Sequence, residues 1–182
     1  MRKSSVITVL IIATGFSFSQ NTSGKRIEKV KVSGTVQITG TYCGGAYPGE
    51  QAIQEMKRPK PLPSKKLYLK AGRKNDFSKA VILAFISDSV GRFSISLAPG
   101  DYCIVDEVKK NKSNYDSILK KCAKGSSENS SVDKKCLLTW FLTPDAVFTV
   151  GKEDLSNVGV MFYDKCSWEK VPCINYTGPL PP

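Results

Sequence analysis

The sequence contains no histidine, and this absence removes several of the commonest catalytic chemistries. Serine–histidine and cysteine–histidine nucleophilic pairs, zinc sites with histidine ligands and the usual general base near neutral pH all need an imidazole. The cysteines also lack the paired C-x-x-C spacing of a four-cysteine zinc site. We therefore expect no enzyme activity, no metal site and no other cofactor.

One apolar segment stands out in the sequence, at the N-terminus, and no second long one follows it. Arg2 and Lys3 precede an apolar run over residues 6–13, and the small residues Ser17 and Ser19 occupy the positions that a signal peptidase reads. This arrangement predicts a secretory signal peptide that is cleaved after Ser19. The apolar run is shorter than the roughly 20 residues of a spanning helix, so no membrane anchor is expected after cleavage.

Removal of the first 19 of 182 residues leaves a chain of the length of one domain. The expected divisions are a signal peptide at 1–19, a flexible leader at 20–29, a β-sandwich domain at 30–165 with an insertion at 106–135, and a cysteine- and proline-rich tail at 166–182 packed on the domain. The expected location is secreted, which includes the periplasm, the cell surface and the extracellular space.

All six cysteines lie beyond the signal peptide, and an even number of cysteines in an exported chain predicts disulfides. They are Cys43, Cys103, Cys122, Cys136, Cys166 and Cys173. Six cysteines can pair in about 15 ways, and the sequence alone does not select one of them. The pairing that we expect is Cys122 with Cys136, because these two cysteines bracket one polar insertion.

Alternation of apolar and polar residues indicates the fold class. It extends over residues 30–41 and 92–97, as in antiparallel strands with one buried and one solvated face. A strand at 67–71 is expected to point Leu69 inward, as it does Leu67, and to point Lys70 outward. The continuous apolar run at 80–86 predicts a central strand that is buried on both faces.

The remaining segments complete an all-β reading with a short helical insertion. Asp88 and Gly91 predict a turn after the apolar run, and Pro99–Gly100 predicts a second turn before a strand from Tyr102 to Val105. Short helices are expected at 50–57 and near 114–124, the second with Ser113 as its cap. Further strands are expected at 137–142, 146–150 and 158–163.

The order of these signals resembles a known family. The residues that carry the resemblance are a first strand that ends in glycine, followed by Ser87-Asp88-x-x-Gly91-x-Phe93-Ser94-Ile95-x-Leu97-x-Pro99-Gly100-x-Tyr102. This pattern resembles the carboxypeptidase regulatory-like domains of secreted bacterial proteins and, more distantly, collagen-adhesin B-type stalk domains. The resemblance implies an antiparallel transthyretin-like (prealbumin-like) β-sandwich of about seven strands, and a non-catalytic partner domain.

Positive charge is the strongest compositional bias. Cleavage of the signal peptide lowers the net charge by two, from +11 to +9, because residues 1–19 contain two bases and no acid. A cluster of nine basic residues is a candidate polyanion-binding surface, together with the lysines of 109–135; the nine are Lys57, Arg58, Lys60, Lys65, Lys66, Lys70, Arg73, Lys74 and Lys79. Export makes nucleic acid an unsuitable ligand, so an acidic glycan or an envelope protein is the expected partner.

The function predicted from the sequence is a secreted, non-catalytic β-sandwich module for binding or structure at the cell envelope or in the extracellular space. The alternative is a surface protein that binds polyanions or glycans through its basic residues. A third, less favoured interpretation is an uncharacterised hydrolase. The acidic pair Glu153 and Asp154 is its candidate for acid–base chemistry, although adjacent acids on a polar turn are typical of a solvated surface.

Overall fold

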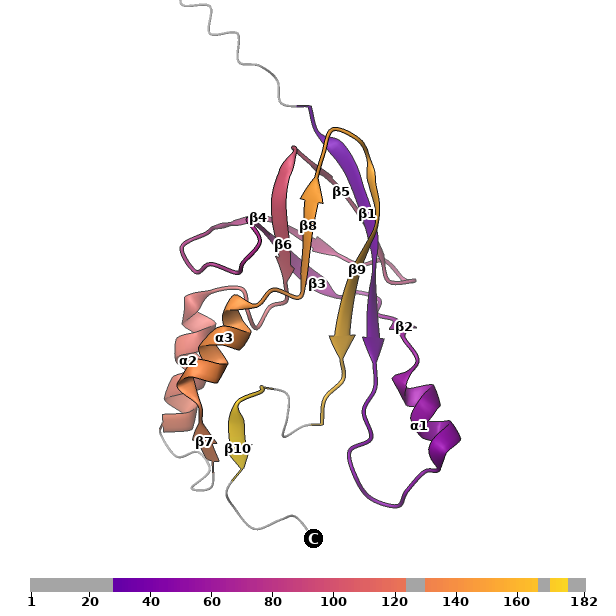
Figure 1. The fold of residues 1–182 in the computed structure, drawn as a ribbon, viewed down its shortest axis with the longest axis vertical. Helices are drawn as coiled ribbons and strands as arrows, with labels where there is room; N and C mark the ends of the chain where they lie inside the picture. Colours follow the sequence, from indigo (N-terminus) through magenta and orange to yellow (C-terminus); the bar gives the residue numbers. More distant parts are fainter. Residues whose placement is uncertain (1–27, 124–129, 167–170, 177–182) are drawn as a thin grey trace, which may run out of the picture.

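The computed structural model describes residues 28–123, 130–166 and 171–176. These residues fold into two β-sheets packed face to face, with helices attached at one end of the sandwich (Figure 1). The predicted signal peptide, most of the predicted leader and parts of the insertion and the tail lie outside the described residues. The coarse prediction of a β-sandwich with a helical insertion is confirmed.

The first sheet is built around β1. Its members are β1 (Val30–Thr39), β2 (Lys60–Pro61), β5 (Arg92–Leu97) and β9 (Leu155–Tyr163). β1 pairs antiparallel with β5 and β2 along one side and parallel with β9 along the other. The sheet is therefore mixed, which differs from the wholly antiparallel sandwich that the alternation predicts. A period of two reports which face of a strand is buried but carries no information on the direction of its neighbour.

The second sheet is antiparallel throughout. Its order is β4 (Val81–Ile86), β3 (Lys66–Ala71), β6 (Gly100–Val105) and β8 (Ala146–Val150). The prediction that β4 is a central strand buried on both faces is wrong, because β4 lies at the edge and its Ile82 and Ile86 are 52% and 60% exposed. A short apolar run does not reveal whether a neighbouring strand lies beyond it.

The inward faces of the two sheets form one hydrophobic core. Its buried members are Val30, Val32, Val36, Leu67, Leu69, Phe93, Ile95, Leu97, Tyr102, Ile104, Phe148, Val150, Val158 and Val160. Burial of one such large side chain stabilises the fold by about 1.5–3 kcal/mol. The predicted turn between β4 and β5 is confirmed, since Asp88 Oδ1 accepts hydrogen bonds from the backbone N–H groups of Val90 and Arg92 at 2.9 and 2.7 Å.

The outer face of the second sheet is covered at its centre, where Tyr68, Lys70 and Cys103 are buried. Two helices between β6 and β8 lie on one side of the lower end of the sandwich, opposite α1 (Glu50–Lys57) (Figure 1). They are α2 (Lys112–Ala123), within the predicted insertion, and α3 (Lys134–Leu142), which extends beyond it. The helices predicted at 50–57 and near 114–124 are confirmed. The cap of α2 differs from the prediction, because Asn111 Oδ1 and not Ser113 accepts the N–H of Asn114, at 2.9 Å.

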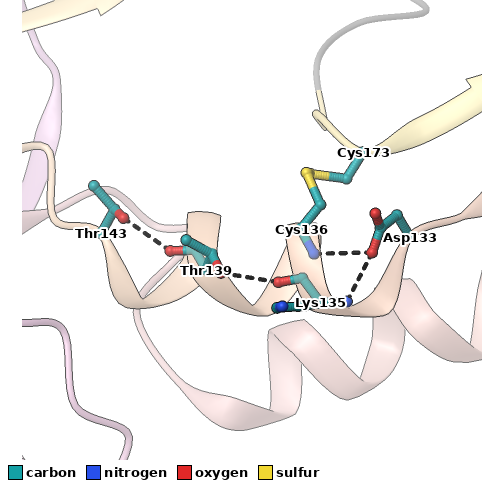
Figure 2. Close-up of a disulfide and its surroundings, with 6 residues drawn as sticks. All are labelled: Asp133, Lys135, Cys136, Thr139, Thr143 and Cys173. Atoms are coloured by element: carbon teal, nitrogen blue, oxygen red, sulfur yellow. Dashed lines mark hydrogen bonds between the residues drawn. A yellow bond between two sulfur atoms is a disulfide. The ribbon is translucent and has the colours of Figure 1, made fainter.

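The segment 137–142 is helical, so the strand predicted there is wrong. Figure 2 shows how α3 begins: Asp133 Oδ1 accepts from the N–H groups of Lys135 and Cys136 at 2.9 and 3.0 Å. Leu137 and Phe141, four residues apart, form the buried face of the helix. A capping aspartate before apolar residues at that spacing is the sequence signal that favours a helix over a strand here.

Lys70 is buried, contrary to the prediction that it points to solvent. Only 1% of its surface is exposed, and its Nζ donates to the backbone oxygen of Asp76 at 3.4 Å. Asn75, in the same loop, is fully buried and fastens the loop to α3, because its N–H donates to Leu142 O and its Nδ2 to Phe141 O. Lys70 therefore lies under a loop that is fixed to the helix.

Two disulfides are present in the described part of the chain. Cys43 bonds Cys166, and Cys136 bonds Cys173. The predicted Cys122–Cys136 pairing is therefore wrong. Cys103 is a buried free thiol, so the expectation of a disulfide at this position is not met; its cross-strand neighbour is Lys70. Burial raises the pKa of the Cys103 thiol, which keeps it protonated near neutral pH.

The second disulfide fixes the start of α3 to the C-terminal segment. That segment forms β10 (Ile174–Tyr176), which pairs with β7 (Ser130–Val132) below the helices (Figure 1). Disulfides of this kind persist in oxidising compartments, which indicates a non-cytoplasmic location. Within the described ranges, no helix has both the length and the apolar character needed to cross a membrane.

The disulfide connectivity can be checked directly. A non-reducing peptide map of the purified protein is expected to give two crosslinks, Cys43–Cys166 and Cys136–Cys173, and to recover Cys103 as an alkylated thiol only after unfolding. A Cys122–Cys136 crosslink, or rapid alkylation of Cys103 in the native protein, contradicts the structure.

The buried lysine gives a pH-dependent prediction. Desolvation lowers the pKa of Lys70 from its usual range, so its burial cost is present below the folded-state pKa and disappears as pH rises toward the unfolded value near 10.4. Lys70→Met is expected to raise the free energy of unfolding at neutral pH by about 1 kcal/mol. In denaturant titrations this gain should shrink as pH approaches about 10.

The matched control is Lys74→Met, because Lys74 is exposed in the same loop. It should change stability little at any pH. Destabilisation by Lys70→Met, or a gain that does not vary with pH, contradicts a charged and poorly solvated Lys70.

Candidate functional site

A groove of about 290 Å³ lies where α3, the end of β6 and the end of β9 meet. Its lining combines charged groups with aromatic and other apolar side chains: Asp106, Lys109, Trp140, Pro144, Asp145, Met161, Phe162, Tyr163 and Lys165. Ligand sites are typically concave, with apolar walls and a few fixed polar groups, and occupy about 300–1,000 Å³. The groove is at the small end of that range.

The groove contains a buried ion pair. Lys109 Nζ donates to Asp145 Oδ1 at 2.7 Å and to the backbone oxygen of Thr143 at 3.0 Å. The two side chains are 7% and 11% exposed. Burial raises the pKa of the Asp145 carboxyl above its usual range, while the charge and hydrogen bond of Lys109 oppose that shift. Lys109 is fixed in place by these contacts.

Asp106 completes the charged part of the groove. Its N–H donates to Asp145 Oδ2 at 2.8 Å, and its Oδ1 accepts from the N–H of Lys109 at 3.1 Å. Lys65 Nζ lies 3.8 Å from Asp106 Oδ2 and 4.5 Å from the centre of the Phe162 ring. Both oxygens of Asp145 are thus engaged within the protein, which leaves neither free to protonate a leaving group.

Aromatic rings form the walls of the groove. The Trp140 ring lies 4.9 Å from Lys109 Nζ and is half-buried, whereas Tyr163 is 66% exposed. Trp140 is supported from behind by Phe141, with ring centres 5.1 Å apart. Phe141 in turn packs on Tyr115 and Phe77, so the wall is anchored in the aromatic cluster between the insertion and the second sheet.

Two further hollows adjoin the groove. One, of about 510 Å³, lies between the end of β1 and α1 and shares Tyr163 with the groove; its lining is Thr39, Gly40, Thr41, Tyr42, Ile53, Met56, Lys57 and Tyr163. The other, of about 470 Å³, shares Trp140 and is lined by Asp133, Lys135, Cys136, Thr139, Trp140, Pro172 and Cys173. The groove and the two hollows therefore form a series in which each hollow shares one aromatic ring with the lining of the groove.

Each member of this series contains one exposed lysine. These are Lys165 in the groove, Lys57 beside α1 and Lys135 at the start of α3. Within the described residues, none of the three forms a salt bridge. The carboxylates of the groove are paired with Lys109 and Lys65, whereas Asp133, which shares a hollow with Lys135, forms no salt bridge in the described part of the chain. Three lysines and one aspartate along the series are therefore without an ion-pair partner, and the balance of these charges is positive.

The structure does not bring the nine predicted polyanion-binding residues together. Lys57, Arg58 and Lys60 lie at α1 and β2, on the side of the first sheet, where Arg58 and Lys60 approach Glu55 at 3.1 and 3.9 Å. The other six belong to β3 and the segments that flank it. Of these, Lys70 is buried and Lys65 contacts the groove.

The remaining four are exposed but differ in their contacts. Arg73 Nη1 lies 3.5 Å from Asp101 Oδ1 and 3.2 Å from Thr149 Oγ1, and Lys66 Nζ lies 5.6 Å from the centre of the Tyr68 ring. Lys74 and Lys79 are exposed in the loop after β3. A cluster that is continuous in sequence is thus divided between two sheets.

The other candidates from the sequence have ordinary structural contacts. Glu153 and Asp154 are exposed, and Asp154 Oδ1 accepts from the N–H of Lys31 at 2.8 Å. In the described ranges, no three histidine, cysteine, aspartate or glutamate side chains are placed to hold a metal ion.

The residues of the groove were not singled out by the sequence. The sequence indicates Lys109 only as one of the lysines of 109–135, and it does not indicate Trp140, Asp145 or Tyr163 as binding residues. They come from four separate segments, and no motif joins them. The one available signal is the helical spacing of Leu137 and Phe141, which would have placed Trp140 at the exposed margin of a docked helix.

No family model matches the chain, and no curated protein is found to match it.

The buried ion pair gives a prediction for stability. Lys109→Ala leaves the Asp145 carboxylate buried without its partner and is expected to lower the free energy of unfolding by about 3–5 kcal/mol. The control is Lys112→Ala, which removes the exposed Lys112–Asp116 pair of α2 and should cost less than about 1 kcal/mol. Equal effects of the two substitutions in urea denaturation would contradict a structural role for the buried pair.

Proposed function

We propose that the protein is a secreted, non-catalytic binding module, and that the groove with its two adjoining hollows is the ligand site. The observation that carries the proposal is the series of three concavities whose linings share Trp140 and Tyr163, with one exposed lysine in each that forms no salt bridge among the described residues. A series of this shape suits an elongated ligand better than a compact one. The two disulfides support an extracytoplasmic place of action.

The ligand class that fits is an acidic glycan. The C–H faces of pyranose rings are apolar and pack on aromatic rings such as Trp140 and Tyr163, which offer large rigid surfaces. Carboxylate or sulfate groups on successive sugars would lie near Lys57, Lys135 and Lys165, none of which forms a salt bridge among the described residues. Hydroxyl groups would meet the fixed polar atoms of Asp106 and Lys109.

Non-catalytic binding is favoured over hydrolysis by the contacts of the carboxylates. An acid catalyst needs an oxygen that faces the substrate, and a raised pKa alone does not provide one. Asp145 uses one oxygen for Lys109 and the other for the N–H of Asp106. These hydrogen bonds assign Asp145 to the structure of the groove.

The proposal includes the resemblance to carboxypeptidase regulatory-like domains and their transthyretin-like fold. Its support is the two-sheet architecture, the aspartate-centred turn at Asp88 and the tight connection between β5 and β6 at Pro99–Gly100. The fold alone does not specify a ligand, so the functional proposal depends on the groove.

The binding proposal is tested by calorimetric titration with neutral, uronic-acid-containing and sulfated oligosaccharides of increasing length. Acidic chains are expected to bind, with an affinity that rises with length and falls with added salt. Trp140→Ala and Tyr163→Ala should each weaken binding about tenfold, which corresponds to roughly 1.4 kcal/mol. Tyr47→Ala is the matched control, because Tyr47 is 65% exposed and lies outside the three concavities.

Each other outcome has a distinct meaning. Binding that depends on salt but not on Trp140 or Tyr163 would overturn the groove as the site and favour general attraction through the basic residues of 57–79. Shortening of the oligosaccharides during incubation would overturn the non-catalytic assignment. Absence of binding to every glycan, with capture of an envelope protein, would overturn the ligand class.

A further inference from the structure

The edge strand β4 has an apolar surface that the described part of the chain does not cover. All six residues of β4 are apolar, in the sequence VILAFI. The outer-face side chains Ile82 and Ile86 are 52% and 60% exposed, and Ala84 between them is also exposed. Edge strands are usually protected by a charge, a proline or a bulge. β4 contains no charge and no proline, and its one irregularity is at Ile82, which has no partner of its own on β3 because Leu69 and Lys70 pair with Leu83 and Val81.

The backbone of β4 offers hydrogen-bonding groups on its free side. Among the described residues β4 pairs with β3 alone, and Ser87 N donates to Lys65 O at 3.1 Å just beyond the strand. Successive residues of a strand direct their N–H and C=O groups to opposite sides. The groups of Ala84 and Ile86 therefore point away from β3, and the same residues carry the exposed apolar side chains.

We propose that this edge binds the same edge of a second copy of the chain, with the two β4 strands antiparallel about a two-fold axis at Ala84. This register places Ala84 opposite Ala84 and Ile82 opposite Ile86 of the second copy. Antiparallel residues that face each other share a face of the sheet, so the exposed isoleucines pair with each other. The two second sheets then form one continuous sheet across the dimer.

A second copy fits this edge because the segment Ile-Leu-Ala-Phe-Ile is symmetric in residue type about Ala84. The two-fold axis pairs isoleucine with isoleucine on the outer face and Leu83 with Phe85 on the core face. An isologous interface requires such self-complementarity. Strand addition of this kind takes its affinity from main-chain hydrogen bonds and its register from alternate side chains.

The charges that flank the strand also match. In this register Lys79, in the bend before β4, and Asp88 of the second copy, in the turn after β4, come to the same end of the interface. Lys79 and Asp88 are both exposed. Each end of the interface therefore places one lysine near one carboxylate, and no like charges meet. Shifting the register by two residues toward Ile86 instead places Asp88 opposite Ile82, which is unfavourable.

The test measures mass by light scattering and amide exchange over a roughly hundredfold range of protein concentration. The wild type is expected to move from monomer to dimer as concentration rises. The exchange of the Ala84 and Ile86 amides should slow at least about tenfold over the same range. The exchange measurement needs no variant, so it does not depend on whether a substituted protein folds.

Charge substitutions at Ala84, on the proposed two-fold axis, test the register of the two strands. Ala84→Asp and Ala84→Lys each place like charges opposite each other and should be monomeric at every concentration. An equimolar mixture of the two variants should dimerise again, because aspartate then faces lysine. Ser96→Asp is the control, since Ser96 is exposed on β5 in the other sheet, and it should dimerise like the wild type.

Four results would overturn the proposal. If the wild type stays monomeric at all concentrations, a second copy of the chain does not bind the β4 edge. This holds even if an added β-strand peptide binds there. Amide protection that does not vary with concentration assigns the edge to another segment of the same chain. If Ala84→Asp still forms dimers, the dimer interface lies elsewhere on the surface. If the mixture of Ala84→Asp and Ala84→Lys stays monomeric, the proposed register is wrong.

Discussion

The ion pair between Lys109 and Asp145 is the interaction on which the lower end of the molecule depends. Through its side chain, Lys109 holds Asp145 and the carbonyl of Thr143; through its own carbonyl, it accepts from Asn75. One residue therefore connects the turn after β6, the loop over β3 and the link from α3 to β8. Together with the buried Leu137 and Phe141 of α3, these connections hold the helices against the outer face of the second sheet, where Lys70 and Cys103 are buried.

The same arrangement explains why the candidate ligand site is rigid before any ligand arrives. Each disulfide lies beside one of the hollows that adjoin the groove. Cys136 and Cys173 line one hollow themselves, and Cys43 follows Tyr42, which lines the other. Cys166 follows Lys165 of the groove. A site held by crosslinks and a buried ion pair loses little conformational entropy when it binds, which favours affinity for a weakly contacting ligand such as a sugar chain.

The parts of the fold that follow from local patterns could be predicted from the sequence, and those that depend on distant contacts could not. Alternation predicted β1 and β5 because one face of each strand is buried, and Asp88 predicted its turn. The apolar runs of β4 and α3 give wrong predictions, since such a run is compatible with an edge strand, a central strand or a buried helix. The alternation of β3 predicts an exposed Lys70, because a period of two carries no information on the loop that covers it. The groove draws residues from four segments, so only the folded chain brings Lys109, Trp140 and Tyr163 together.

The central claim is that the groove and its adjoining hollows form the ligand site, and amide chemical-shift mapping tests it most directly. The measurement titrates an acidic oligosaccharide into isotopically labelled protein at moderate salt. The account predicts saturable shifts at residues 133–140 and 161–165, and at residues 39–42 and 53–57, with few elsewhere. Shifts confined to the exposed lysines at 66, 74 and 79, or spread over the whole basic surface, would contradict it.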